Sequence, residues 1–138
     1  MNSDSPTPKC SAQALPRIGC DLVHIPRIAK SIEKKAFVDR VFSGLEIEYC
    51  NSKPQSAPHF AARFAAKEAF LKALGTGLFT NGMGTLDIEV AHESSGRPLL
   101  KLSAQAQILL EKAGYGHTDV SLSHHGEYAM ATVILLPY

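Results

Sequence analysis

The sequence contains no tryptophan, few cysteines and almost no net charge. Its three cysteines, Cys10, Cys20 and Cys50, are odd in number and form no C-x-x-C pair, so neither a disulfide framework nor a cysteine zinc site is expected. The formal charge of +1 is too small for a bulk electrostatic attraction to nucleic acid. No apolar run reaches the roughly 18 residues that a membrane span needs. These absences predict a cytoplasmic protein with free thiols and without nucleic-acid or membrane partners.

The length and composition are typical of one globular domain. The chain has 138 residues, of which 45% are hydrophobic and 20% are charged. Residues 1–15 are rich in Ser, Pro, Thr and Ala, and they show neither a periodic pattern nor the apolar core of a signal peptide. We therefore expect a flexible leader at 1–15 and a single domain at 16–138.

The order of helical and extended patterns predicts an α+β fold with an antiparallel sheet. The most informative helix is expected at residues 59–74, because Ala, Leu, Lys and Glu dominate it and Gly75 suits its C-terminal end. Its apolar residues fall on nearly every side, which is typical of a central helix. The other expected helices are at 26–35, 43–49 and 103–113, and the expected strands are at 17–23, 85–91, 97–102, 119–124 and 128–136.

Four polar residues in apolar settings are candidates for chemistry: Asp21, Glu68, Lys72 and His124. Taken singly, each has an ordinary explanation as a helix cap, a member of an i, i+4 helix pair or a core histidine. Taken together, two carboxylates without a neighbouring cysteine suit a hard cation such as Mg²⁺. A lysine and a histidine beside that ion suit phosphate binding and proton transfer. The set predicts phosphoryl-type chemistry on a diphosphate.

The segment from Arg27 to Arg40 is more basic than the rest of the chain. It holds five basic and two acidic residues, a local balance of 5 − 2 = +3 against +1 for the whole sequence. A solvated helix face explains this excess as readily as a docking surface for an acidic partner does. Both interpretations stay open at this point.

Several motifs resemble, in order and spacing, those of the holo-acyl-carrier-protein synthases, a family of 4′-phosphopantetheinyl transferases. The resemblance extends from about Pro16 to Leu136. The combination of G-x-D with a downstream K-E-A helix is specific, whereas a G-K/R-P turn alone is a weak signal. The matching motifs are G-x-D at 19–21, K-E-A at 67–69 with Lys72, G-T-G at 75–77, G-R-P at 96–98 and S-x-S-H at 121–124.

The resemblance implies a fold, a reaction and an assembly. The implied fold is an antiparallel sheet packed against the long central helix. Such enzymes transfer 4′-phosphopantetheine from coenzyme A to a serine of apo acyl carrier protein in the presence of Mg²⁺. They release adenosine 3′,5′-bisphosphate and support fatty acid biosynthesis. Short members of the family form homotrimers with the active site between subunits.

The resemblance also implies roles for individual residues. Asp21 and Glu68 match the magnesium ligands, Lys72 matches a phosphate-neutralising lysine, and His124 matches a histidine near the coenzyme diphosphate. The general base stays open between a metal-bound water, Glu68 and His124. Further candidates are Arg63, Lys67 and Arg97 for the adenosine phosphates, with a solvated helix charge as an equal alternative for Lys67, and Arg27, Lys30 and Lys34 for docking the carrier protein.

Three features depart from the family's pattern. His24 stands where many members have an acidic residue, His125 follows His124 where an acidic or small polar residue is common, and the leader is long. These differences bear on the choice of carrier protein and on the pH response. Two other classes compete with an enzyme: a non-catalytic protein that binds an acidic partner, and a small RNA-binding domain. The near-neutral charge speaks against the RNA-binding class.

Overall fold

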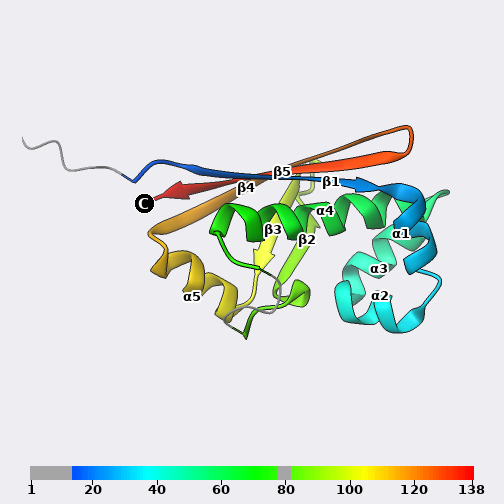
Figure 1. The fold of residues 1–138 in the computed structure, drawn as a ribbon, viewed down its shortest axis with the longest axis horizontal. Helices are drawn as coiled ribbons and strands as arrows, with labels where there is room; N and C mark the ends of the chain where they lie inside the picture. The colour runs from blue at the N-terminus through cyan, green and yellow to red at the C-terminus, as the bar shows by residue number, and fades with distance from the viewer. Residues whose placement is uncertain (1–13, 78–81) are drawn as a thin grey trace, which may run out of the picture.

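The computed structural model describes residues 14–77 and 82–138, so most of the expected leader lies outside the described residues. The main sheet is antiparallel and has the strand order β1 (Arg17–His24), β5 (Tyr128–Pro137) and β4 (Tyr115–His125). A smaller antiparallel pair consists of β2 (Ile88–His92) and β3 (Pro98–Leu102). Figure 1 shows the main sheet as one layer of the molecule, with the helices on one side of it. The expected α+β class is confirmed.

The long helix α4 (Ser56–Leu74) lies against the inner face of the main sheet. Its many buried alanines leave little volume between helix and strand, and this allows a close approach. Gly19 of β1 is the point of closest approach: a Cβ atom there would lie 1.9 Å from the carbonyl oxygen of Ala69. The helix ends at Gly75, which has a positive φ of 83° and donates its N–H to the carbonyl of Leu71. The expected central helix is confirmed, although it begins at Ser56.

Four shorter helices complete the described fold. At one end of the molecule lie α1 (Ile25–Ser31), α2 (Lys35–Val41) and α3 (Gly44–Asn51), whereas α5 (Ala104–Lys112) lies at the other end (Figure 1). The side chain of Ser43 accepts a hydrogen bond from the backbone N–H of Glu46, and the side chain of Glu46 accepts one from the backbone N–H of Ser43. These two bonds form a capping box at the start of α3, the helix expected at 43–49.

The single helix expected at residues 26–35 is wrong. Helix α1 ends at Ser31 and α2 begins at Lys35, with extended backbone at Lys34 just before α2 (φ −93°, ψ 110°). The break turns the chain back toward the core, where Phe37 lies with its ring centroid 6.2 Å from Phe42 and 6.4 Å from Phe64. The burial of this aromatic side chain outweighs the helical propensity of the segment.

The strand expected at 85–91 begins later, at Ile88, because residues 85–87 form the 3₁₀ turn η2 (Thr85–Asp87). The side chain of Asp87 accepts a hydrogen bond from the backbone of Gly84 at 2.8 Å and so closes that turn. Leu86, which lies within this turn and not in the strand, is 52% exposed.

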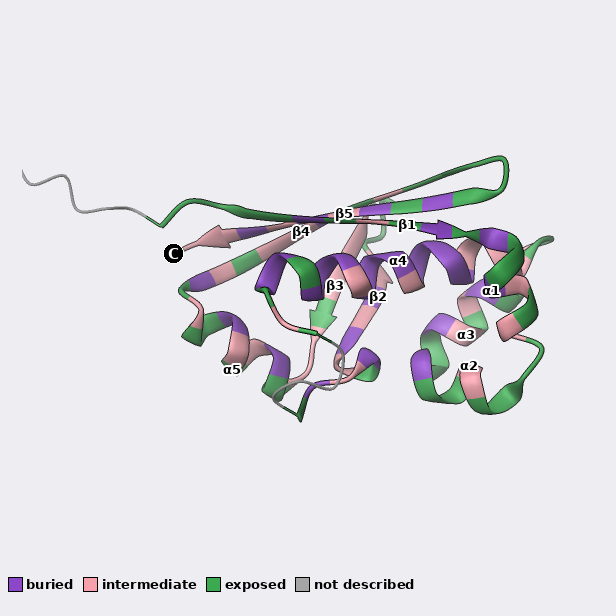
Figure 2. Ribbon diagram, in the orientation of Figure 1, coloured by how far each residue is buried: buried purple, intermediate pink, exposed green. Residues whose placement is uncertain are grey.

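The outer face of the main sheet is not covered by any described helix (Figures 1 and 2). It nevertheless carries large apolar side chains, of which Ile18 and Leu22 are 69% and 63% exposed, and Met130 is exposed as well. This apolar outer face is unusual for a strand surface in water. No described helix is long and apolar enough to cross a membrane.

Candidate active site

Asp21 is held at one edge of the main sheet, on the inner face toward α4. It lies two residues after Gly19, and strand alternation directs both residues to the same face. The close contact of Gly19 with Ala69 brings this part of β1 directly onto the C-terminal half of α4. The glycine of the G-x-D motif therefore positions the aspartate against the helix.

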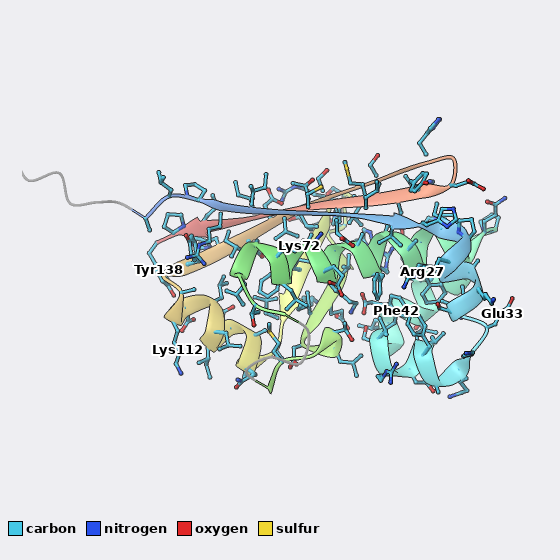
Figure 3. All side chains as sticks on the ribbon, viewed as in Figure 1. Arg27, Glu33, Phe42, Lys72, Lys112 and Tyr138 are labelled. Carbon is cyan, nitrogen blue, oxygen red and sulfur yellow. The ribbon has the colours of Figure 1, made fainter. Side chains whose placement is uncertain are left out.

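Lys72 approaches Asp21 from α4. Its Nζ atom donates hydrogen bonds to Asp21 Oδ1 at 2.9 Å and to the carbonyl oxygen of Cys20 at 3.1 Å. The hydrogen bond and the charge of Asp21 raise the pKa of Lys72, so this side chain stays protonated. More than half of the side chain is exposed, and Figure 3 shows Lys72 on α4 just beneath the main sheet. A cation is therefore fixed beside the carboxylate and stays accessible from outside.

Glu68 lies one helical turn before Lys72 and is the second carboxylate of this group. Burial raises the pKa of Glu68, the negative charge of Asp21 raises it further, and Lys72 opposes both effects. The influence of Asp21 means that the two carboxylates are close enough to repel each other. Asp21, Glu68 and Lys72 are called the carboxylate site below.

A cavity of about 440 Å³ opens beside the carboxylate site and is lined by both Asp21 and Glu68. Part of its lining is apolar and includes Phe37 and Phe64. At its rim, His24 Nε2 lies 3.8 Å from Glu127 Oε2 in the hairpin between β4 and β5. A ligand with both a polar, charged part and a less polar part matches this lining.

A second group of residues gathers around the ring of Tyr49 in α3. The ring of His92 stacks on Tyr49 with centroids 4.6 Å apart, and the ring of His59 lies 6.0 Å away. Lys53 Nζ is 4.6 Å from the Tyr49 centroid. The ring of His124 lies 6.1 Å from that of His59 and extends the group to β4. These residues, together with Arg63, are called the histidine cluster below.

Arg63 forms the base of the histidine cluster. Its guanidinium carbon lies 4.1 Å from the centroid of the Tyr49 ring, and Nη1 donates to the carbonyl oxygen of His59 at 3.2 Å. The residue is only 1% exposed, yet Nε and Nη2 have no hydrogen-bond partner among the described residues. No described carboxylate forms an ion pair with any member of the cluster. The cluster is therefore a concentration of positive charge suited to an anion.

The carboxylate site and the histidine cluster do not meet within one chain. Asp21 is on β1 and His124 is on β4, the two outer strands of the main sheet, with β5 between them. Two strand spacings amount to roughly 10 Å. His124 also lies beside His59, which is nine residues, or about 13 Å, from Glu68 along α4. The structure thus brings together Asp21, Glu68 and Lys72 but not His124.

The prediction that Lys67 binds an adenosine phosphate is wrong for this structure, and so is its alternative as a solvated charge. Lys67 is fully buried, and its Nζ donates to Glu46 Oε1 at 2.7 Å and to the carbonyl oxygens of Thr85 and Ile88. These three bonds use all of its donors. Burial lowers the pKa of Lys67 while the charge of Glu46 opposes this effect. Lys67 joins α3, α4 and the start of β2 from inside the core.

Arg97 is engaged in ion pairs at the other side of the molecule. Its Nη2 lies 2.6 Å from Asp119 Oδ2 on β4, and its Nη1 lies 3.6 Å from Glu93 Oε1. About half of the side chain stays exposed at a cavity of about 510 Å³ that also involves Ile18 of the apolar outer face. Its predicted role toward the coenzyme phosphates stays a prediction.

The residues predicted to dock a carrier protein lie near the break between α1 and α2. Arg27 lines the cavity of the carboxylate site, which places it beside the chemistry (Figure 3). Lys30 and Lys34 instead line a separate hollow of about 440 Å³ together with Arg40. Lys30, Lys34 and Arg40 are called the basic turn below.

The ordinary explanations for the single residues fail in two cases. Asp21 does not cap α1, because the N-cap position is His24, which makes no side-chain capping bond. Lys72 forms an ion pair with Asp21, a residue from a distant part of the sequence. Sequence analysis missed His59, His92 and Tyr49, since their spacing along the chain follows no motif and only the fold brings them together.

Comparisons with known proteins decide the family. Residues 17–133 match the model of the 4′-phosphopantetheinyl transferase superfamily. The chain belongs to this superfamily. This 4′-phosphopantetheinyl transferase is an enzyme. Its resemblance to the holo-acyl-carrier-protein synthases is confirmed by similar sequences and by similar solved structures.

Two curated relatives carry the name holo-acyl-carrier-protein synthase. The protein from Geobacter sp. strain M21 is 49% identical over 119 residues, which cover 85% of this chain and 94% of the relative. The protein from Gloeobacter violaceus is 48% identical over 127 residues, covering 90% and 95%.

Solved structures of the same name share the fold. The Neisseria meningitidis synthase gives a TM-score of 0.78 at 29% identity, covering 86% of this chain and 96% of that one. The Helicobacter pylori synthase, solved in complex with coenzyme A, gives a TM-score of 0.74 at 32% identity, with coverage of 86% and 98%.

Proposed function

We propose that this phosphopantetheinyl transferase moves 4′-phosphopantetheine from coenzyme A to a serine of apo acyl carrier protein, releases adenosine 3′,5′-bisphosphate and supports fatty acid biosynthesis. The observation that carries the proposal is the carboxylate site, in which Asp21, Glu68 and Lys72 lie together beside a cavity of about 440 Å³. The names of the relatives and the coenzyme A complex of a structural neighbour support it. The free thiols of Cys20 and Cys50 support a cytoplasmic location.

The residues of the carboxylate site fit Mg²⁺. Asp21 and Glu68 supply hard oxygen ligands, and the mutual repulsion that raises the pKa of Glu68 would be relieved by a cation between them. Two protein carboxylates are a usual number for Mg²⁺, whose other ligands are water and substrate phosphates. When bound, the ion supplies positive charge to a diphosphate.

The side chains around the carboxylate site would stabilise charge and accept a proton during the transfer. The oxygen of the carrier serine forms a bond to the phosphorus that bears pantetheine, while the bond to adenosine 3′,5′-bisphosphate breaks. Lys72 is fixed by Asp21 and stays protonated, so it can offset the negative charge of the transferring group. Glu68 lies in the same group, whereas His124 could take the serine proton only if it came from another copy of the chain.

We further propose that the enzyme is a homotrimer with active sites between copies. The carboxylate site is at the β1 edge of the main sheet and the histidine cluster is near the β4 edge, so an edge-to-edge contact of two copies would bring them together. Such a contact joins the β1 edge of one copy to the β4 edge of the next, and three copies joined in this way form a closed ring. If the ring turns the outer faces of its sheets inward, it also covers the apolar outer face around Ile18 and Leu22. Arg63 and His124 of one copy would complete the active site of the neighbouring copy and bind the coenzyme phosphates there.

The basic turn is proposed to dock the carrier protein together with Arg27. Lys30, Lys34 and Arg40 offer positive charge around a hollow, with Glu33 as the acidic residue that lines it. Ser31 and Phe37 line both this hollow and the active-site cavity, and Arg27 lines the active-site cavity as well. An acidic partner bound here would have its reactive serine directed toward Asp21 and Glu68.

The deciding experiment is incubation of the enzyme with apo acyl carrier protein, coenzyme A and Mg²⁺, followed by mass spectrometry of the carrier protein. The proposal expects a gain of one phosphopantetheine unit and the appearance of adenosine 3′,5′-bisphosphate. An unchanged carrier mass under saturating coenzyme A would refute it. The competing interpretation as a non-catalytic binding protein predicts that outcome.

A further inference from the structure

The histidine cluster contains two imidazoles, His59 and His92, that no step of the proposed reaction uses. Both rings flank Tyr49, with centroid distances of 6.0 Å and 4.6 Å. Both residues are partly exposed, so a ligand can reach them, whereas Arg63 beneath them is buried. They form an accessible layer above an unpaired guanidinium.

All described neighbours with a resolved charge contribution on these two imidazoles are basic. For His59 they are Arg63, His124, Lys53 and His92, and for His92 they are Arg63 and Lys53. Tyr49 is the neutral ring at the centre. Two carboxylates that neighbour the cluster along the chain are engaged elsewhere, since Glu46 pairs with Lys67 and Glu93 pairs with Arg97. Glu48, next to Tyr49, is exposed and makes no resolved charge contribution to either imidazole.

This arrangement disfavours charge on the imidazoles while the site is empty. Burial lowers the pKa of His59 and of His92, and the charge of Arg63 lowers both further. A phosphate group placed among the same residues offsets this positive charge. It favours the imidazolium form, which donates hydrogen bonds from both ring nitrogens.

We infer that His59 and His92 are additional ligands for a phosphate group of the adenosine moiety of coenzyme A, and that they bind it as imidazolium ions after taking up protons from solvent. The inference rests on the proposed function, because it names further residues for the same substrate. The buried Arg63 supplies a permanent charge that attracts the phosphate, and Lys53 supplies another. The two histidines supply a part of the affinity that depends on pH.

Linkage gives the direction of that dependence. A group that gains a proton on binding makes the affinity fall as pH rises above the pKa of the free group. Each proton taken up weakens binding about tenfold per pH unit in that range. Coenzyme phosphates should therefore bind more tightly at pH 6 than at pH 8.

The probe that tests this inference is adenosine 3′,5′-bisphosphate without Mg²⁺, so that the carboxylate site is not involved. Isothermal titration calorimetry in two buffers of different ionisation enthalpy measures the protons taken up per ligand bound. For the unmodified chain we expect an uptake of about one proton near neutral pH. His59→Gln and His92→Gln should each lower this uptake and flatten the pH dependence of the affinity.

The control is His117→Gln, which removes an exposed imidazole on β4 outside the cluster and should change neither quantity. Thermal unfolding of every variant checks that the fold is kept. Binding without proton uptake, or uptake that persists in the His59→Gln and His92→Gln variants, would overturn the inference. So would coenzyme A binding with no measurable binding of the bisphosphate. In each case transfer to the carrier protein still tests the proposed function separately.

Discussion

At the scale of single residues, Asp21 and Glu68 should be indispensable for transfer. Asp21→Asn and Glu68→Gln each remove one negative charge from the carboxylate site and keep the shape of the side chain. We expect each to lower the transfer rate by about a hundredfold or more, because stabilisation of charge at the diphosphate is lost. Mass spectrometry of the carrier protein in a time course measures the loss.

The matched control is Glu111→Gln on α5, an exposed carboxylate far from the cavity along the fold. It should leave the rate unchanged. Transfer at the unmodified rate by the Asp21→Asn variant at limiting Mg²⁺ would contradict the role of Asp21.

Lys67 should matter for stability, because it is an ion-paired residue of the core. Lys67→Met leaves the carboxylate of Glu46 buried without its partner. Breaking a buried pair in this way costs about 3–5 kcal/mol of unfolding free energy. Urea denaturation followed by circular dichroism measures the change.

The double variant Glu46→Gln with Lys67→Met removes the uncompensated charge and keeps one acceptor oxygen for the two backbone N–H groups, of Ser43 and Val90, that donate to Glu46. It should recover part of the lost stability. A double variant that is less stable than Lys67→Met alone would show that the charge of Glu46 has another partner.

At the scale of elements, the contact of β1 with α4 determines where the carboxylates lie. Gly19→Ala places a methyl group where the carbonyl oxygen of Ala69 already lies, and neither backbone can move without separating strand from helix. We expect a lower melting temperature and a weaker coupling between Asp21 and Lys72, and therefore slower transfer.

The comparison for this prediction is Gly44→Ala at the start of α3, where a Cβ atom meets nothing within 4 Å. That change should be neutral or slightly stabilising, because alanine favours a helix. A Gly19→Ala variant as stable and as active as Gly44→Ala would contradict the close-packing explanation.

The basic turn should affect the carrier protein and not the coenzyme. Charge reversal by Lys30→Glu with Lys34→Glu introduces repulsion toward an acidic partner. The KM for the carrier protein should rise about tenfold or more, while the KM for coenzyme A stays unchanged. Steady-state kinetics with each substrate varied in turn measures both constants, and Lys112→Glu on α5 is the control for charge reversal elsewhere.

The elements themselves were largely predictable from sequence, and the exceptions have physical reasons. Gly75 and Ser43 act locally, through backbone conformation and capping, so their helix ends were predicted correctly. The break between α1 and α2 depends on the packing of Phe37. Its ring packs against those of Phe42 and Phe64, which come later in the chain. No local pattern contains that information.

At the scale of the whole molecule, the sequence motifs identified the residues of the site but not their distribution in space. Asp21 and Glu68 were expected to come together, and the structure places them at one cavity. Lys67 could not be told from a surface lysine, because Glu46 is far away in sequence and reaches it only through the packing of α3 on α4. The separation of His124 from Asp21 follows from the strand order, which the motifs do not state.

The proposed division of the active site between two sheet edges leads to a complementation experiment. Glu68→Ala damages only the carboxylate site, and His124→Ala damages only the histidine cluster. When both variants are produced together in equal amounts, about one quarter of the interfaces combine two intact halves. Transfer activity should then reach about a quarter of the unmodified level, although each variant alone is nearly inactive. Mixed chains no more active than the separate variants would show that each chain works alone.

The edge positions of the two halves also have a consequence for the living cell. If a complete site exists only where copies touch, then a newly made chain is folded but idle until it finds others. The catalytic capacity would then rise more steeply than the number of chains at low abundance. The supply of active carrier protein would depend on the rate of synthesis of this small enzyme as well as on its kinetic constants.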